Sequence, residues 1–121
     1  MSKNNLYHYR ATLERVVDGD TIDVKLDLGF DLHLQARIRF AGINAPESRT
    51  RDLVEKQKGL EAKRFVEDWL NGCETIIVQT QLDKKGKFGR ILGNILNADG
   101  ACLNEEMVSL GHATPYDGGK R

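Results

Sequence analysis

Residues 20–40 read DTIDVKLDLGFDLHLQARIRF, and this stretch decides the fold. From residue 22 to residue 40 every even-numbered position is apolar, and every odd-numbered position between them is polar or glycine. A period of two residues is typical of strands with one buried face and one solvated face. A single strand of this length would be unusual. Gly29, which lies between two aspartates, therefore predicts a hairpin or a bulged bend near residues 28–31.

The chain on either side of this stretch supplies three more strands and two helices. One helix is indicated by apolar residues at helical spacing, namely Ala62, Phe65, Val66, Trp69 and Leu70. Asn104 is expected to cap the second, short helix, which Gly111 ends. The other expected elements are strands at 7–15, 74–82 and 91–97, a polar loop at 41–56, and the first helix at 58–71.

The resulting order, β-β-β-α-β-β-α, predicts an α+β fold that is mainly β. Five short strands with a helix between the third and the fourth fit a Greek-key barrel of the OB type with about two helices. A chain of 121 residues and 13.6 kDa is the size of one domain. We therefore expect a single domain over residues 1–121, with mobile ends at 1–6 and 114–121.

Composition excludes several classes of protein. Lys plus Arg and Asp plus Glu are 18 each, so a nucleic-acid partner would be bound by a local site and not by a large positive field. No apolar run is long enough to span a membrane, and the N-terminus has no hydrophobic signal core. We expect a cytoplasmic location, or a secreted one if an export signal has been removed. The two cysteines are far apart, which favours free thiols over a disulfide or a zinc site.

Three polar clusters lie where predicted strands begin or end. The first contains Asp20, the second contains Arg39, Asn44 and Glu47, and the third is KFGR at 87–90. Each cluster alone has an ordinary structural explanation: a hairpin turn, a proline turn beside surface charges, and a solvated basic loop. Together they point to phosphodiester chemistry, because oxygen ligands suit a hard cation and arginines suit a phosphate. A glutamate can act as general base toward water.

Five motifs carry a resemblance to a known family. VVDGDTIDV, RFAGINAPE, GLEAKRFV, KFGR and LNEEMVSLGHA resemble, in this order, motifs of the staphylococcal nuclease (thermonuclease) family. The likeness runs from about Ala11 to Ala113. It implies a five-stranded OB barrel and a Ca²⁺-dependent phosphodiesterase that cuts DNA, RNA or both with little sequence preference.

The resemblance also implies a role for individual residues. Asp20 matches the metal-binding aspartate, Asn44 stands at the second metal-ligand position, and Ala45 offers its backbone carbonyl. Glu47 matches the proposed general base. The phosphate-binding arginines are Arg39 and Arg90, and the implied nucleotide contacts are Lys87, Phe88 and Tyr116.

The sequence departs from the family pattern at two site residues, and the departure at Asn44 leaves a second hypothesis open. Asn44 replaces a residue that is commonly aspartate, so the site has one negative charge fewer and is expected to bind Ca²⁺ more weakly. Phe88 replaces a tyrosine and keeps only a stacking face. The leading hypothesis is an active, monomeric nuclease. The alternative is a catalytically weak or inactive domain of the same type that binds nucleic acid or protein.

Overall fold

Five strands close into a barrel in the order β1-β2-β3-β6-β5. They are β1 (His8–Asp18), β2 (Thr21–Gly29), β3 (Leu32–Phe40), β5 (Ile76–Leu82) and β6 (Ile91–Asn97). Neighbouring strands are antiparallel except β3 and β6, which pair in parallel at residues 38–40. This computed structural model describes residues 7–48, 50–82 and 91–116. The five-stranded barrel that the sequence predicts is confirmed.

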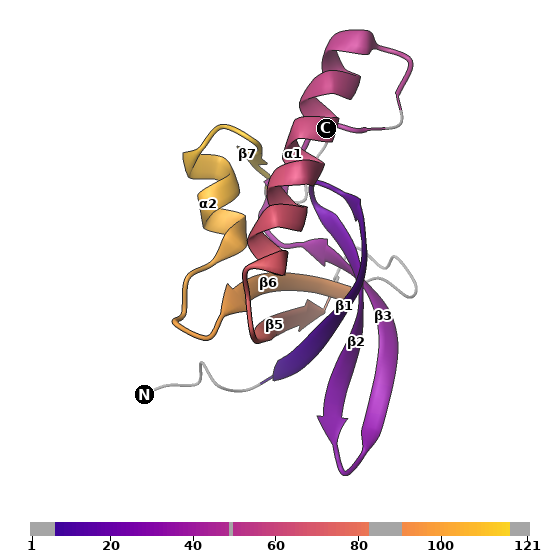
Figure 1. Cartoon of the computed structure of the whole chain (residues 1–121), viewed down its shortest axis with the longest axis vertical. Coiled ribbons are helices and arrows are strands. Elements are labelled where there is room, and N and C mark those ends of the chain that lie inside the picture. Colours follow the sequence, from indigo (N-terminus) through magenta and orange to yellow (C-terminus); the bar gives the residue numbers. More distant parts are fainter. Residues whose placement is uncertain (1–6, 49, 83–90, 117–121) are drawn as a thin grey trace.

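Two helices and a small second sheet complete the fold. Helix α1 (Leu53–Asn71) joins β4 to β5, and helix α2 (Leu103–Ser109) follows β6. The two-residue strands β4 (Ile43–Asn44) and β7 (Thr114–Pro115) pair with each other, so residues 114–115 of the expected mobile tail are part of a sheet. Figure 1 shows α1 running alongside the barrel, with its first turns beyond it at one end. In the part of the chain that is described, no helix is long and apolar enough to cross a membrane.

The core combines the inner faces of the strands with one stripe of α1. The fully buried residues of the barrel include Ile22, Val24, Ile38, Val78 and Ile95, and the stripe consists of Gly59, Ala62, Val66 and Leu70. Phe65 and Trp69 pack against this core but stay partly exposed. The indole N–H of Trp69 donates to Glu106 Oε1 at 3.1 Å, which ties α1 to α2.

The β2–β3 hairpin differs from the prediction in its burial. The bulge between Asp27 and Gly29 and the turn at residues 30–31 confirm the predicted bend. The alternation, however, predicts that all the even-numbered residues are buried, and this is wrong at the far end of the hairpin. The exposed residues there are Leu28, Phe30, Leu32 and Leu34. The reason is that β1 pairs with β2 only as far as Asp27, while β6 meets β3 only at its other end.

Helix α1 begins five residues earlier than expected. Asp52 caps it, because its carboxylate accepts hydrogen bonds from the backbone N–H groups of Val54 and Glu55. The apolar residues of this first turn, Leu53 and Val54, are exposed. The hydrophobic periodicity therefore does not predict the first turn of the helix, because no apolar face is buried there. The assignment of residues 53–56 to a loop is wrong.

Asn104 does not cap α2, contrary to the prediction. The helix starts one residue before it, with Cys102 at the cap position. The Asn104 side chain is buried and reaches the barrel instead. Its oxygen accepts from Ile95 N at 3.0 Å, and its amide donates to Ala41 O at 2.9 Å and to Gly93 O at 3.1 Å. One side chain thus joins α2, β6 and the end of β3.

Both cysteines are free thiols, as expected. Burial is the main cause that raises the pKa of Cys73 and of Cys102 above the ordinary thiol value, and the charge of Glu106 adds to it at Cys73. The thiolate is the reactive form of cysteine, so neither environment favours a nucleophilic role.

Candidate active site

The candidate site is built where the end of β3 meets the turn between β1 and β2. Asp20 lies in this turn, immediately before β2, and Arg39 is the second-last residue of β3. The register of the β2–β3 pair places Thr21 opposite Arg39, and the backbone N–H of Phe40 donates to Asp20 O at 2.8 Å. Ordinary strand pairing therefore brings the aspartate and the arginine together.

Asp20 is a buried carboxylate whose oxygens have defined partners. Its Oδ2 lies 3.0 Å from Nη1 of Arg39 and accepts a hydrogen bond from the backbone N–H of Ala45, also at 3.0 Å. Its Oδ1 accepts from the Thr21 hydroxyl at 3.0 Å. A carboxylate with an exposed fraction of only 8% needs such compensation, because an unpaired buried charge is strongly unfavourable.

Arg39 connects Asp20 to the following segment. Its guanidinium donates to the backbone oxygen of Ile43 and to Oδ1 of Asn44, both at 3.3 Å. The ring of Tyr116 lies below the guanidinium, with 5.9 Å between the carbon of the guanidinium and the ring centroid, within range of a cation–π interaction. The backbone N–H of Tyr116 donates to Gly42 O at 2.8 Å, next to β4 and β7.

Glu47 is held through its neighbours. Asp18 Oδ1 accepts from the backbone N–H of Ser48 at 3.3 Å and from the Ser48 hydroxyl. The backbone N–H of Glu47 donates to Glu55 Oε2 at 3.3 Å, on the first turn of α1. The Glu47 side chain is exposed. Its backbone is therefore fixed on both sides while its carboxylate faces solvent.

Two glycines allow α1 to approach this corner closely. A Cβ on Gly59 would lie 2.3 Å from the backbone oxygen of Glu47, and a Cβ on Gly19 would lie 2.7 Å from Cβ of Ala62. Neither distance is possible without a shift of the backbone. Any larger residue at Gly59 would push the Glu47 segment away from the helix.

A cavity of about 500 Å³ adjoins the site on the side of α1. Asn44, Ala45 and Pro46 form one wall, and Lys58 of α1 lies in another. His112 also lines the cavity, with its ring stacked on Phe65 at a centroid distance of 4.8 Å. The cavity and the ion pair thus share Asn44 and Ala45 as a common border.

The structure brings together five of the nine residues expected at the site: Asp20, Arg39, Asn44, Ala45 and Tyr116. Glu47 is three residues beyond Asn44. Lys87, Phe88 and Arg90 lie outside the described residues. Within residues 7–48, 50–82 and 91–116, no group of three or more His, Cys, Asp or Glu side chains is placed to hold a metal.

Sequence reasoning did not identify the residues that support Glu47. Asp18 reads as a turn former and Ser48 as a loop residue, and their contact joins positions 30 residues apart. Gly59 lies in a helix, where glycine has no local purpose. The position of Gly59 inside a predicted helix is the one sequence signal for this support, because such a glycine indicates a close approach of another segment.

Comparison with known proteins places these features in a family. Residues 37–120 match the staphylococcal nuclease homologue family. The chain is 33% identical over 114 residues to Endonuclease YhcR of Bacillus subtilis, an alignment that covers 89% of this chain and 9% of that protein. It is 32% identical over 103 residues to an uncharacterized endonuclease of Escherichia coli, covering 85% of this chain and 58% of that protein.

A third relative has a similar level of identity. An uncharacterized protein of Methanocaldococcus jannaschii is 31% identical over 129 residues, covering 90% of this chain and 60% of that protein. The chain thus spans less than two thirds of each of these relatives. The family match covers most of the chain and includes Arg39, Asn44 and Glu47, and the barrel is the one that the motifs imply. The chain belongs to the staphylococcal nuclease homologue family.

Proposed function

We propose that this chain is a nuclease that hydrolyses phosphodiester bonds of DNA, RNA or both, with a divalent cation, Ca²⁺, as cofactor. Family membership and the endonuclease names of two of the relatives support the general activity. The observation that carries the proposal is the contact of Asp20, Arg39 and Asn44. Arg39, the proposed phosphate-binding group, lies within hydrogen-bond distance of both Asp20 and Asn44, the two proposed cation ligands.

The donors at this corner fit a hard cation. Asp20 offers a carboxylate, Asn44 an amide oxygen and Ala45 its backbone carbonyl, and all are oxygen ligands of the kind that Ca²⁺ takes. With one charged ligand, most of the coordination would be left to water and to the substrate phosphate. A cation bound here would polarise a phosphoryl oxygen and favour the ionised form of a bound water.

The side chains of the chain have separate roles in this proposal. Arg39 lies between Asp20 and Asn44, so a phosphate bound by its guanidinium would be next to the proposed cation ligands. The guanidinium would stabilise the charge that gathers on the phosphoryl oxygens in the transition state. Glu47 would accept a proton from the attacking water, and Arg90 would be a second phosphate-binding group.

A second candidate function rests on Asn44. With an amide in place of a carboxylate, the site lacks a charge that would retain the cation, and a weakly loaded site would leave a domain that binds nucleic acid or protein without cleaving it. Such a domain would bind oligonucleotides with a salt-dependent affinity.

Incubation of the purified protein with single-stranded DNA and with RNA tests the proposal. We expect degradation with millimolar Ca²⁺, none with EDTA, and a loss of about 10²-fold or more in the Glu47→Gln variant. Glu14→Gln is a matched control, because Glu14 is an exposed residue of β1 that accepts a hydrogen bond from the Gln35 side chain and, in the described part of the chain, makes no hydrogen bond or ion pair with the site residues. Intact nucleic acid with Ca²⁺, Mg²⁺ and Mn²⁺ in turn would favour the binding domain.

Asn44→Asp tests the proposed cation ligand. The added carboxylate is expected to lower the Ca²⁺ concentration needed for half-maximal activity by about tenfold, because Ca²⁺ affinity rises with the charge of its ligands. Calcium titrations of the activity measure this concentration, and calorimetry without substrate measures the Ca²⁺ affinity of the free protein. An unchanged Ca²⁺ affinity in both would show that residue 44 is not a ligand.

Asp18→Ala tests the support of Glu47. Loss of the contact with Ser48 is expected to reduce kcat by about tenfold to 10²-fold with little change in KM, because a small displacement of a catalytic group is sufficient for this. Asp18→Asn keeps an acceptor oxygen and is expected to retain most of the rate. Equal kcat values for all three proteins would contradict the role of Asp18.

A further inference from the structure

The guanidinium of Arg39 holds the same side-chain oxygens that are proposed as cation ligands. Its Nη1 lies 3.0 Å from Asp20 Oδ2, and its Nη2 donates to Asn44 Oδ1 at 3.3 Å. One positively charged group thus contacts both the carboxylate and the amide oxygen. The proposed phosphate-binding group and the proposed cation therefore have two ligands in common.

The Asp20 carboxylate has little capacity left for a further partner. Its Oδ2 also accepts from the backbone N–H of Ala45, and its Oδ1 accepts from the Thr21 hydroxyl, both at 3.0 Å. A carboxylate oxygen has about two lone-pair directions, so Arg39 and Ala45 together use those of Oδ2. A cation on this oxygen would have to take the direction that Arg39 uses.

The charges lead to the same conclusion. The side chains of Arg39 and Asp20 are only 14% and 12% exposed, so solvent screens the charges between them poorly. A divalent cation bound to Asp20 and Asn44 would lie directly beside the positive guanidinium. Because like charges at such a distance repel strongly where water is largely excluded, the two cannot share these oxygens at full strength.

We propose that Arg39 and the divalent cation compete for Asp20 and Asn44, and that Arg39 withdraws from both side chains when the cation binds. The donors that Arg39 releases are then available to the substrate phosphate. Arg39 is therefore an internal counterion of Asp20 before the cation binds and a phosphate ligand afterwards. This inference rests on the proposed cation site and adds an order to its use, with the cation before the phosphate.

Arg39 keeps other contacts after such a withdrawal. Its guanidinium donates to Ile43 O at 3.3 Å and lies 5.9 Å from the centroid of the Tyr116 ring, within range of a cation–π interaction. Neither contact uses an oxygen of Asp20 or the amide oxygen of Asn44. These contacts would keep the guanidinium at the site while the two proposed ligands turn to the cation.

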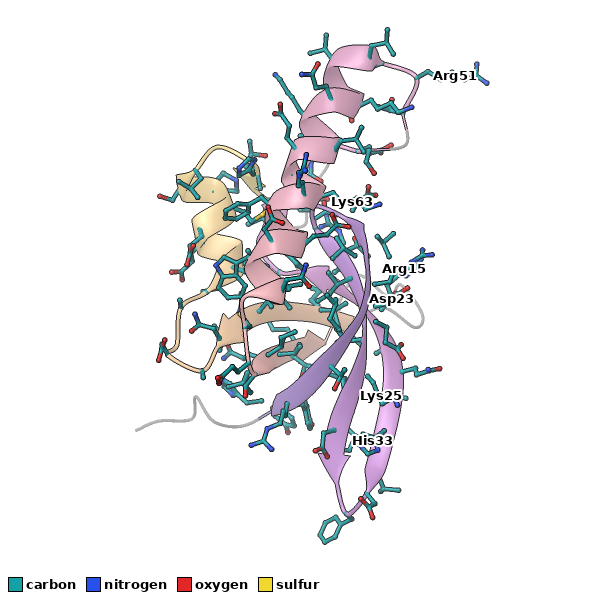
Figure 2. All side chains as sticks on the ribbon, in the orientation of Figure 1. Arg15, Asp23, Lys25, His33, Arg51 and Lys63 are labelled. Atoms are coloured by element: carbon teal, nitrogen blue, oxygen red, sulfur yellow. The ribbon has the colours of Figure 1, made fainter. Side chains whose placement is uncertain are left out.

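A second carboxylate–arginine pair on the same strands provides the control. Arg37 donates to Asp23 Oδ1 at 2.8 Å, and Figure 2 shows Asp23 beside Arg15, which lies 3.6 Å from its carboxylate. Arg37 is two residues before Arg39 on β3, and in the described part of the chain no hydrogen bond or ion pair joins it to Asp20 or Asn44. Its charge acts on a cation at Asp20 only from a distance.

Calorimetric titration with Ca²⁺ in the absence of substrate tests the competition. Arg39→Gln is expected to bind Ca²⁺ at least about tenfold more tightly than the wild type, because its competitor for the two ligands is gone. Arg37→Gln removes one charge from the same strand and is expected to change the Ca²⁺ affinity by less than about threefold, because that charge is exposed and screened. Circular dichroism of each variant verifies its fold.

A double variant locates the effect at Asp20. Asp20→Asn combined with Arg39→Gln is expected to lose the gain in Ca²⁺ affinity, since the charged ligand for which Arg39 competes is then absent. A gain that persists in the double variant would place the bound Ca²⁺ elsewhere and contradict the competition.

Nuclear magnetic resonance of the wild type tests the withdrawal without any variant's stability. In protein labelled with ¹⁵N-arginine, the Nε–H signal of Arg39 is expected to shift in step with Ca²⁺ binding, and that of Arg37 is expected to stay in place. Arg39→Lys assigns the signal by its loss.

Two further results would overturn the inference. They are an Arg39→Gln variant that binds Ca²⁺ no more tightly than the wild type, and an Arg39 signal that Ca²⁺ leaves unchanged at saturation. If nucleic acid is still cleaved with Ca²⁺, the proposed nuclease stands and only the competition fails. Tighter Ca²⁺ binding by Arg39→Gln, with no cleavage by the wild type, supports the competition and contradicts the nuclease. Absence of Ca²⁺ binding in all these proteins contradicts both.

Discussion

Arg39→Ala is expected to reduce the rate of phosphodiester cleavage by about 10²-fold or more, the range found when a preorganised transition-state donor is removed. The structure adds a second consequence, because Arg39 is also the ionic partner of the buried Asp20 at 3.0 Å. Its removal leaves a carboxylate with little exposure, at an expected loss of about 2–4 kcal/mol in the free energy of unfolding. Cleavage rates and urea unfolding of the same preparation measure both effects.

Two further variants separate the roles of Arg39. Arg39→Lys keeps the charge beside Asp20 but loses the planar fork, so we expect it to recover stability much more than rate. Arg37→Ala is the matched control two residues earlier on β3. Arg37 donates to Asp23 at 2.8 Å and thereby lowers the pKa of that carboxyl, and the pair lies on the exposed face of the barrel. We expect the rate to be unchanged there, and a similar loss in both variants would argue against a special role for Arg39.

Asn104→Leu is expected to lower the free energy of unfolding by about 3–5 kcal/mol, the largest effect on stability among these variants. The leucine has a similar volume, but it leaves Ile95 N and Ala41 O without the partner that Asn104 provides, while Gly93 O keeps the hydrogen bond from Ala41 N. Each buried polar group that loses its partner costs about 1–3 kcal/mol. Since domains are stable by only about 5–15 kcal/mol, the Tm is expected to fall by at least about 10 °C.

Asn94→Leu provides the comparison for this prediction. Asn94 is also on β6, but it is only partly buried and its amide donates to the side chain of Gln79 at 3.2 Å. We expect its replacement to change stability by less than about 1 kcal/mol. Thermal and urea unfolding of both variants measure the loss in the free energy of unfolding. Equal losses for the two variants would mean that the Asn104 bridge is not what joins α2 to the barrel.

The sequence pattern predicts the barrel correctly where buried and exposed residues alternate along a strand. Residues 22–26 and 36–40 alternate because one face lies in the core, so their structure could be read directly from the chain. At residues 28–34 the same alternation continues, but the neighbouring strands do not extend that far. The pattern of residue types is therefore a reliable guide to strand and turn, but not to which strand has a neighbour to bury it.

In the candidate site, too, the sequence predicts the residues but not the contacts between distant segments. Asp20, Arg39, Asn44 and Glu47 could be named from their motifs, since these types of side chain at strand ends point to cation and phosphate binding. The contacts of Asp18 with Ser48 and of Gly59 with Glu47 join segments that are distant in the chain. No local pattern encodes such a contact, because only the packing of α1 against the turn creates it.

The sequence alone predicts the order of the five barrel strands and two helices, the hairpin bend and a set of candidate site residues, because each depends on the periodicity or chemistry of nearby residues. Only the tertiary structure decided which apolar residues stay in water, that Asn104 bridges three segments, and that Asp20 and Arg39 form a buried pair. These properties depend on which surfaces meet when the barrel closes and the helices pack on it. That arrangement is set by burial of the whole core and not by any single stretch of the chain.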